Sequence, residues 1–221
     1  MKLNRNATWP VVLILIALPF AYAGYLYPSL NDRIPTHFNA AGEADAWGSK
    51  DNIFLLPTIL GATSLLVYLL LANIKKIDPK RASGIGTETI KGLGVFTVAS
   101  MSFMSLVVEY GIAHEGTPID KLLFGALGVL FAGMGYFMPK LKQNYFAGYK
   151  LAWTLDNETN WNRTHQLAGK LWITGGLLQI VFAILLQGTT LFIVFMTTMA
   201  IISIVPGIYS YLLFKKGNPA A

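Results

Sequence analysis

The chain has 221 residues, of which 54% are hydrophobic and only 13% are charged. A soluble domain of this size cannot bury so much apolar surface, so the composition predicts a membrane protein. The net charge of +6 at pH 7 does not indicate a nucleic-acid-binding protein, because the basic residues lie in short clusters between apolar runs. The absence of cysteine excludes disulfides, thiolate zinc sites and cysteine nucleophiles.

Six apolar runs are long enough to cross a bilayer, whose hydrocarbon core of about 30 Å needs roughly 20 residues of helix. They are residues 9–27, 53–74, 93–113, 119–138, 168–186 and 191–214. The first run resembles a secretory signal, since Lys2 and Arg5 precede it and Ala21-Tyr22-Ala23 resembles a cleavage site. Because this run continues to Tyr27, we expect it to remain as the first helix. The sequence therefore predicts an all-α polytopic membrane protein with six transmembrane helices.

The distribution of basic residues predicts the orientation of these helices. When the N-terminus is placed in the cytoplasm, all but three of the 17 basic residues fall on the cytoplasmic side. The exceptions are Arg33, Lys50 and Lys121. We therefore expect both termini inside the cell. Acidic residues outnumber basic ones on the outer side, which favours cationic partners there.

The outer loop between the first two helices carries a cluster of polar residues. Pro35 and Gly42 are turn formers and predict a compact folded loop, with Trp47 near the membrane interface. The polar side chains of this loop are His37, Asn39, Glu43 and Asp45. They are candidates to converge on a cation or another ligand. However, one imidazole with two carboxylates has no diagnostic zinc spacing, so these three groups are weak metal candidates and a hydrogen-bonded loop without metal is expected.

A second concentration of polar and aromatic residues precedes the fifth apolar run. Asp156 or Asn157 is suited to cap a helix in which Glu158, Trp161 and His165 share one face. This spacing predicts an interfacial amphipathic helix before the fifth transmembrane helix. One interpretation is an aromatic belt whose neighbouring basic residues contact anionic lipids. The alternative is a cytoplasmic binding surface built around Glu158 and His165.

Two motifs of the chain resemble known bacterial membrane modules. The first consists of Pro35, His37, Asn39, Gly42, Asp45, Trp47 and Lys50. It resembles the signature of a small membrane domain of unknown function. The second consists of Asn144, Gly148, Lys150, Trp153, Thr154, Glu158, Trp161, His165 and Gly169. It resembles the SdpI family, and bacterial immunity proteins of that family carry both modules in this order. On this reading, residues 1–91 form a two-helix module with the outer loop, and residues 92–221 form a four-helix module.

The resemblance implies a multi-pass protein of the bacterial plasma membrane that protects the cell against a secreted, membrane-active peptide toxin. It also implies recruitment of a cytoplasmic repressor protein, as in the best-known member. The expected partners are membrane lipids, the toxin outside and the repressor inside, without direct contact to nucleic acid. Lys150 departs from the second motif, in which arginine is common, and lysine cannot make the bidentate contacts of arginine.

Two other classes of function remain open. A small transporter or ion-coupled carrier is disfavoured because Glu109 lies near the outer end of its predicted helix, whereas carriers place charged groups near the midplane. A membrane-embedded, metal-dependent enzyme is disfavoured because the sequence has no H-E-x-x-H, G-x-S-x-G or P-loop pattern. We therefore expect no enzymatic activity, no catalytic residue and no cofactor.

Overall fold

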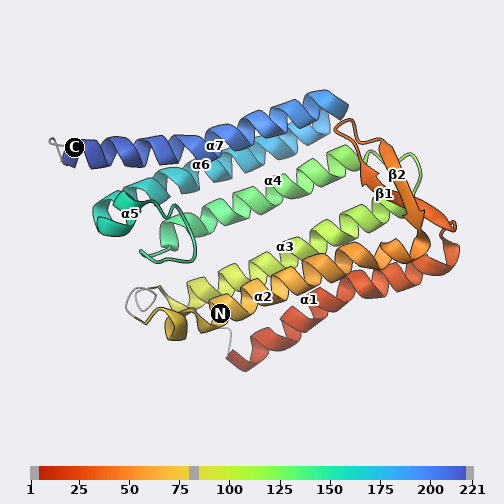
Figure 1. The fold of residues 1–221 in the computed structure, drawn as a ribbon, viewed down its shortest axis with the longest axis horizontal. Coiled ribbons are helices and arrows are strands. Elements are labelled where there is room, and N and C mark those ends of the chain that lie inside the picture. The colour runs from red at the N-terminus through yellow and green to blue at the C-terminus, as the bar shows by residue number, and fades with distance from the viewer. Residues whose placement is uncertain (1–4, 80–84, 218–221) are drawn as a thin grey trace.

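The computed structural model describes residues 5–79 and 85–217 and shows a bundle of six long helices with a β-hairpin at one end (Figure 1). The long helices are α1 (Arg5–Leu26), α2 (Leu55–Ile77), α3 (Thr87–Ala113), α4 (Ile119–Phe137), α6 (Glu158–Leu185) and α7 (Gly188–Gly217). The hairpin consists of β1 (Arg33–Phe38) and β2 (Ala44–Ser49). The short elements are the 3-10 turns η1 (Tyr27–Ser29), η2 (Lys50–Phe54) and η4 (Met138–Lys140) and the helix α5 (Ala152–Asp156).

The six long helices have the length and the apolar composition needed to cross a membrane. This confirms the predicted all-α polytopic fold. The largest difference from the predicted spans is α6, which begins at Glu158 rather than Ala168. Asn157 caps α6, because its side chain accepts a hydrogen bond from the Asn160 amide at 2.9 Å. The predicted interfacial helix is thus continuous with the fifth transmembrane helix, and its place at the membrane interface stays a prediction.

The helices pack in two groups that meet between α3 and α4. Helix α3 packs against both α1 and α2, whereas α6 packs against α4 and α7 (Figure 1). The division into residues 1–91 and 92–221 would separate α3 from the two helices that precede it. That division stays a prediction.

Glycines allow α4 and α6 to approach each other closely. A Cβ at Gly128 would lie 2.7 Å from the carbonyl oxygen of Gly176, and one at Gly135 would lie 2.9 Å from that of Gly169. Such short distances require small residues, as is common between membrane helices. Gly169 of the second motif therefore has a packing role.

The two ends of the bundle carry different structures. The β-hairpin lies at one end, together with the α3–α4 and α6–α7 connections, and we call this the hairpin end (Figure 1). The opposite end, which we call the α5 end, holds α5 and both ends of the described chain. The predicted orientation places the hairpin end outside the cell. It rests partly on Lys2, Lys80 and Arg81, which lie outside the described residues.

The absence of natural cysteines allows this orientation to be tested directly. Glu115 and Lys150 are exposed at the hairpin end and the α5 end, respectively. In intact cells, a membrane-impermeant maleimide is expected to label a Glu115→Cys variant. A Lys150→Cys variant is expected to react only after the membrane is permeabilised. Labelling of Lys150→Cys in intact cells would reverse the orientation.

Candidate functional site

The β-hairpin forms around a turn that Asn39 stabilises. Its side-chain oxygen accepts hydrogen bonds from the amides of Ala41 at 2.9 Å and Glu43 at 3.1 Å. Gly42 has a φ of +81°, a conformation that favours glycine. The sequence predicted a folded loop here but not paired strands, because β1 contains Pro35 and neither strand alternates apolar with polar residues.

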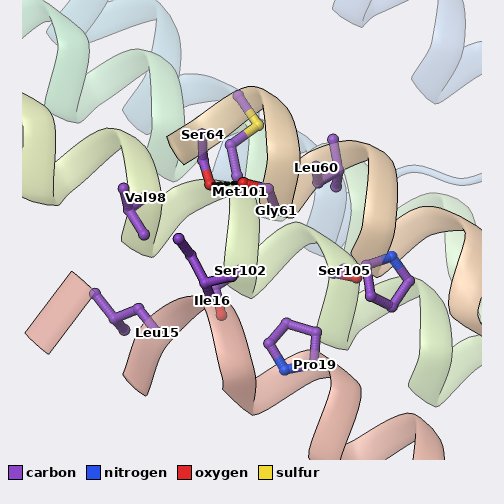
Figure 2. A pocket seen from close by; sticks show the side chains of 11 residues that line it. Leu15, Ile16, Pro19, Leu60, Gly61, Ser64, Val98, Met101, Ser102 and Ser105 are labelled. Atoms are coloured by element: carbon purple, nitrogen blue, oxygen red, sulfur yellow. Dashed lines mark hydrogen bonds between the residues drawn. The ribbon is translucent and has the colours of Figure 1, made fainter. Parts of the chain in front are cut away.

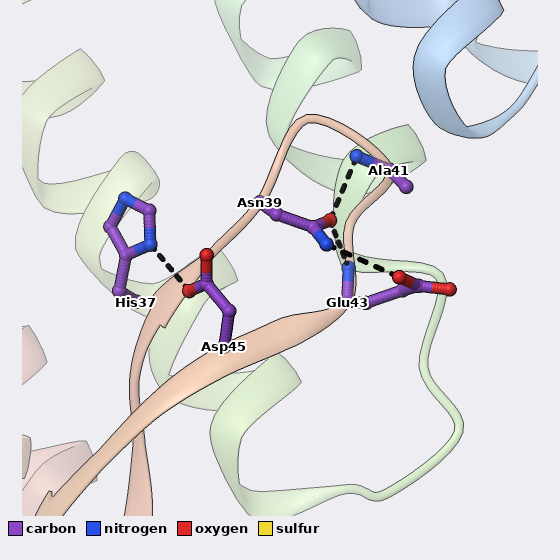
Figure 3. A network of polar contacts seen from close by, with 5 residues as sticks. All are labelled: His37, Asn39, Ala41, Glu43 and Asp45. Carbon is purple, nitrogen blue, oxygen red and sulfur yellow. Dashed lines mark hydrogen bonds and ion pairs between the residues drawn. The ribbon is translucent and has the colours of Figure 1, made fainter.

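The polar side chains of the hairpin form two separate pairs (Figure 3). His37 Nδ1 lies 2.6 Å from a carboxylate oxygen of Asp45. The side-chain Nδ2 of Asn39 donates a hydrogen bond to the Glu43 carboxylate at 3.2 Å. Across residues 5–79 and 85–217, no group of three or more His, Cys, Asp or Glu side chains is placed to hold a metal ion. The contacts of these four residues hold the two strands and the turn in register.

The base of the hairpin is attached to the ends of α1 and α2. The Lys50 ammonium lies 3.2 Å from Asp32 and 5.3 Å from the centre of the Tyr27 ring. The Tyr27 hydroxyl donates to Asp51 at 2.6 Å. Each of these exposed contacts is weak by itself, and together they connect the base of the hairpin to the ends of α1 and α2.

The tip of the hairpin contacts the C-terminal helices. Gly42 lies against Asp120 in the first turn of α4, where a Cβ at Gly42 would be 2.9 Å from the Asp120 Cβ. Asp120 is buried, and its carboxylate accepts a hydrogen bond of 2.6 Å from the Gly188 amide at the start of α7. Asp120 therefore connects the hairpin tip to the α6–α7 turn. Sequence reasoning missed this role, because Asp120 and Gly188 are 68 residues apart and no local pattern relates them.

A cleft of about 430 Å³ opens between the hairpin and the α3–α4 connection. Its walls include the apolar side chains of Phe38, Trp47 and Ile112 and the charged side chains of Arg33 and Glu115. Trp47 is 50% exposed, so its indole ring is available to a ligand. A cleft with apolar walls and charges of both signs suits a peptide segment that is itself amphipathic.

At the α5 end, the second motif folds into a turn-rich segment between α4 and α6. Asn144 is fully buried, and its side-chain oxygen accepts hydrogen bonds from the Phe146 and Ala147 amides at 2.8 Å each. The buried Thr154 hydroxyl accepts a hydrogen bond from the Leu151 amide at 3.0 Å. Asn144 lies in a turn without regular structure and Thr154 in the first turn of α5, and both side chains supply hydrogen-bond partners to backbone groups, so their role is structural.

His165 connects this segment to α6. Its Nε2 accepts a hydrogen bond from the Tyr149 amide at 3.0 Å, so the ring proton is on Nδ1, which donates to the Trp161 carbonyl at 2.8 Å. The imidazole stacks on the Trp161 indole with ring centres 4.0 Å apart, and Trp161 Nε1 donates to the Leu141 carbonyl at 2.7 Å. Gly148 has a φ of +109°, and a Cβ there would collide with the His165 ring.

Two further tryptophans, Trp153 of α5 and Trp172 of α6, form hydrogen bonds with α7. Trp153 Nε1 donates to the Ser210 hydroxyl at 2.8 Å, and Trp172 Nε1 donates to the Ile202 carbonyl at 3.0 Å. The Tyr149 hydroxyl donates to the same carbonyl at 3.0 Å. Burial raises the pKa of the Tyr149 phenol, which keeps this donor protonated. The indole groups thus satisfy their hydrogen bonds within the protein.

Burial separates the structural members of the second motif from the accessible ones. Trp161 and His165 are 0% and 1% exposed, so they cannot offer their side chains to a partner. Lys150 and Glu158 are exposed. The sequence suggested a binding surface built around Glu158 and His165. Of these two, Glu158 is accessible and His165 is buried, so a docking face at the α5 end would be built on Glu158 and Lys150. Helical spacing placed Trp161 and His165 on one face but did not show that this face is covered.

Both motifs correspond to known families. Residues 140–210 match the SdpI/YfhL protein family, and residues 14–61 match a domain of unknown function, DUF1648. The Immunity protein SdpI of Bacillus subtilis is 22% identical over 208 residues, which cover 94% of this chain and 96% of the relative. An uncharacterized protein of Archaeoglobus fulgidus is 34% identical over 58 residues, which cover 26% of this chain and 32% of the relative. No solved structure matches the chain significantly.

These matches agree with the resemblance that the two motifs carried. The DUF1648 match ends within α2, and the SdpI/YfhL match runs from η4 to α7. The similarity to an immunity protein along most of the chain supports the class of membrane immunity proteins, and neither matched family is described as an enzyme. The protein is a multi-pass protein of the plasma membrane.

Proposed function

We propose that this protein protects its own cell against a secreted, membrane-active peptide toxin. The observation that carries the proposal is the similarity to the Immunity protein SdpI over 94% of the chain, which includes both modules. In the predicted orientation the hairpin end faces the medium, so a toxin from outside meets the hairpin first. The hairpin end is then the toxin-facing surface.

The chemistry of the hairpin end favours a cationic, amphipathic peptide. The exposed carboxylate of Glu115 in the cleft wall attracts positive charge, and the half-exposed Trp47 ring offers an apolar contact in the same cleft. Tryptophan is among the residues that contribute most to binding when a partner covers them. Trp47 is therefore the residue whose loss should weaken toxin capture most.

Recruitment of a cytoplasmic repressor is a second candidate function, and the α5 end is the surface that supports it. A cleft of about 430 Å³ lies between α5, the start of α6 and the end of α7. Asp156, Arg163 and Lys216 contribute charged groups to its walls, and Lys150 and Glu158 are exposed at the same end. Toxin protection and repressor recruitment would then use opposite ends of the bundle.

Expression of the protein in a toxin-sensitive bacterium that lacks its own immunity protein tests both functions. We expect the protein to raise survival in the presence of a secreted cationic membrane-active peptide. A Trp47→Ala variant should tolerate at least about tenfold less peptide, since loss of such an anchor costs about 2 kcal/mol of binding. A matched Lys150→Ala variant, altered at the opposite end, should protect normally but weaken a reporter of repressor recruitment.

Protein levels must be measured for each variant. Absence of protection against every such peptide at normal levels of the unaltered protein would refute the immunity function. If Trp47→Ala and Lys150→Ala each removed both activities, a single conformational switch would replace the account with two separate faces.

A further inference from the structure

A small polar cavity lies inside the helix group formed by α1, α2 and α3, away from both candidate surfaces. Figure 2 shows that side chains from all three helices surround it. Ser64 of α2 and Ser102 and Ser105 of α3 contribute hydroxyl groups, whereas Ile16 and Pro19 of α1 are apolar. Its volume of about 10 Å³ is close to what one water molecule requires. Hydroxyl groups around such a space are the surroundings in which buried water is found.

Two buried oxygen atoms of α3, one at the cavity and one joined to it through Ser105, have no hydrogen-bond partner within the described part of the chain. One is the Ser102 hydroxyl, which faces the cavity, and the other is Oε2 of Glu109. The remaining Glu109 oxygen accepts a hydrogen bond from the Ser105 hydroxyl at 2.8 Å. The spacing of Ser102, Ser105 and Glu109 places them on one face of α3. An unpartnered buried polar atom is costly, so this line of groups implies a missing partner.

The surroundings of Glu109 do not supply a compensating charge. Its side chain is 1% exposed, and the ion pairs among the described residues do not include it. Tyr22 of α1 lies near Glu109, and its phenol is uncharged at neutral pH. A lone carboxylate within a membrane helix is costly, and a bound proton removes its charge. A protonated carboxyl group also gains a hydroxyl that can donate a hydrogen bond.

We propose that Glu109 and the serine-lined cavity together form a buried proton-binding site. The proton adds reversibly to Glu109 Oε2, and Ser105 continues to donate to the other oxygen. A water molecule occupies the cavity and bonds to the Ser102 hydroxyl. The site is independent of the proposed immunity function. It makes the group of helices α1, α2 and α3 responsive to proton concentration.

Infrared spectroscopy of the full chain in lipid nanodiscs tests the proton site. The unaltered protein is expected to show a carboxylic-acid carbonyl band that disappears in Glu109→Gln. Raising the pH should replace that band with carboxylate bands. The band should persist in Glu115→Gln, a matched change of an exposed carboxyl at the same end. Ser105→Ala should shift the band, because it removes the hydrogen bond that Glu109 accepts. If Glu109→Gln does not fold, this shift assigns the band to Glu109.

The cavity water has its own test. Exchange into heavy-oxygen water is expected to shift an O–H band of buried water in the unaltered protein and not in Ser102→Ala. The proposal is overturned if no acid band depends on Glu109 at any pH at which the protein stays folded. A Glu109 band that persists unchanged until alkaline unfolding would also overturn it, because the group would then be permanently neutral.

Discussion

Replacement of Gly148 by alanine is expected to destabilise the folded protein by about 3 kcal/mol or more. The backbone at Gly148 has a φ of +109°, which costs a residue with a side chain about 1–3 kcal/mol. The added Cβ would also collide with the His165 ring, and overpacking of this kind costs about 1–3 kcal/mol. The ring cannot move aside without losing its bonds to the Tyr149 amide and the Trp161 carbonyl.

Gly116→Ala is a matched control for this prediction. Gly116 also has a positive φ, of +80°, but no atom lies within 4 Å of the position that its Cβ would take. This control therefore carries the backbone cost without the collision. Thermal unfolding in detergent should give a clearly lower midpoint for Gly148→Ala than for Gly116→Ala. Equal midpoints would show that the contact with His165 does not determine the requirement for glycine.

The six membrane helices could be predicted because their signal is local. Each run of about 20 apolar residues specifies a helix by itself, since backbone groups in lipid must bond within their own segment. The predicted fourth span, residues 119–138, differs little from α4 (Ile119–Phe137). The predicted fifth span began only at residue 168, because residues 158–167 are polar and do not extend the apolar run. The start of α6 was signalled separately by Asn157, which was predicted as a possible cap of a helix before that span.

The hairpin and the α5 end were harder to predict because their contacts are not local. Leu141 and Tyr149, which bond to Trp161 and His165, lie in a segment without the periodicity that would reveal which helix face it covers. In the outer loop, Asn39 and Gly42 signalled a turn correctly, but the strands on either side are polar and mostly exposed. Their pairing follows from the turn and from their attachment to the bundle.

Asp120→Ala is expected to loosen both structures that Asp120 holds, the hairpin tip and the α6–α7 turn. The variant leaves the half-buried Gly188 amide without its 2.6 Å partner, which costs about 1 kcal/mol. It also removes the side chain against which Gly42 packs. Hydrogen exchange at the Gly188 amide and proteolysis within residues 39–43 should therefore both become faster. Asp120→Asn keeps an acceptor oxygen and a similar volume, so its effect should be smaller.

Glu115→Ala is the control for this experiment, because Glu115 is an exposed carboxylate at the same end of the bundle. Within the described residues, it holds neither the hairpin tip nor the α6–α7 turn. This variant should leave both rates unchanged. If Asp120→Ala accelerates exchange at Gly188 but not proteolysis of the hairpin turn, the hairpin tip is held by other contacts. If both rates rise together, a single buried carboxylate couples the DUF1648 hairpin to the SdpI/YfhL region. A toxin that displaces the hairpin on binding would then also displace the start of α7, because Asp120 contacts Gly42 of the hairpin and Gly188, the first residue of α7.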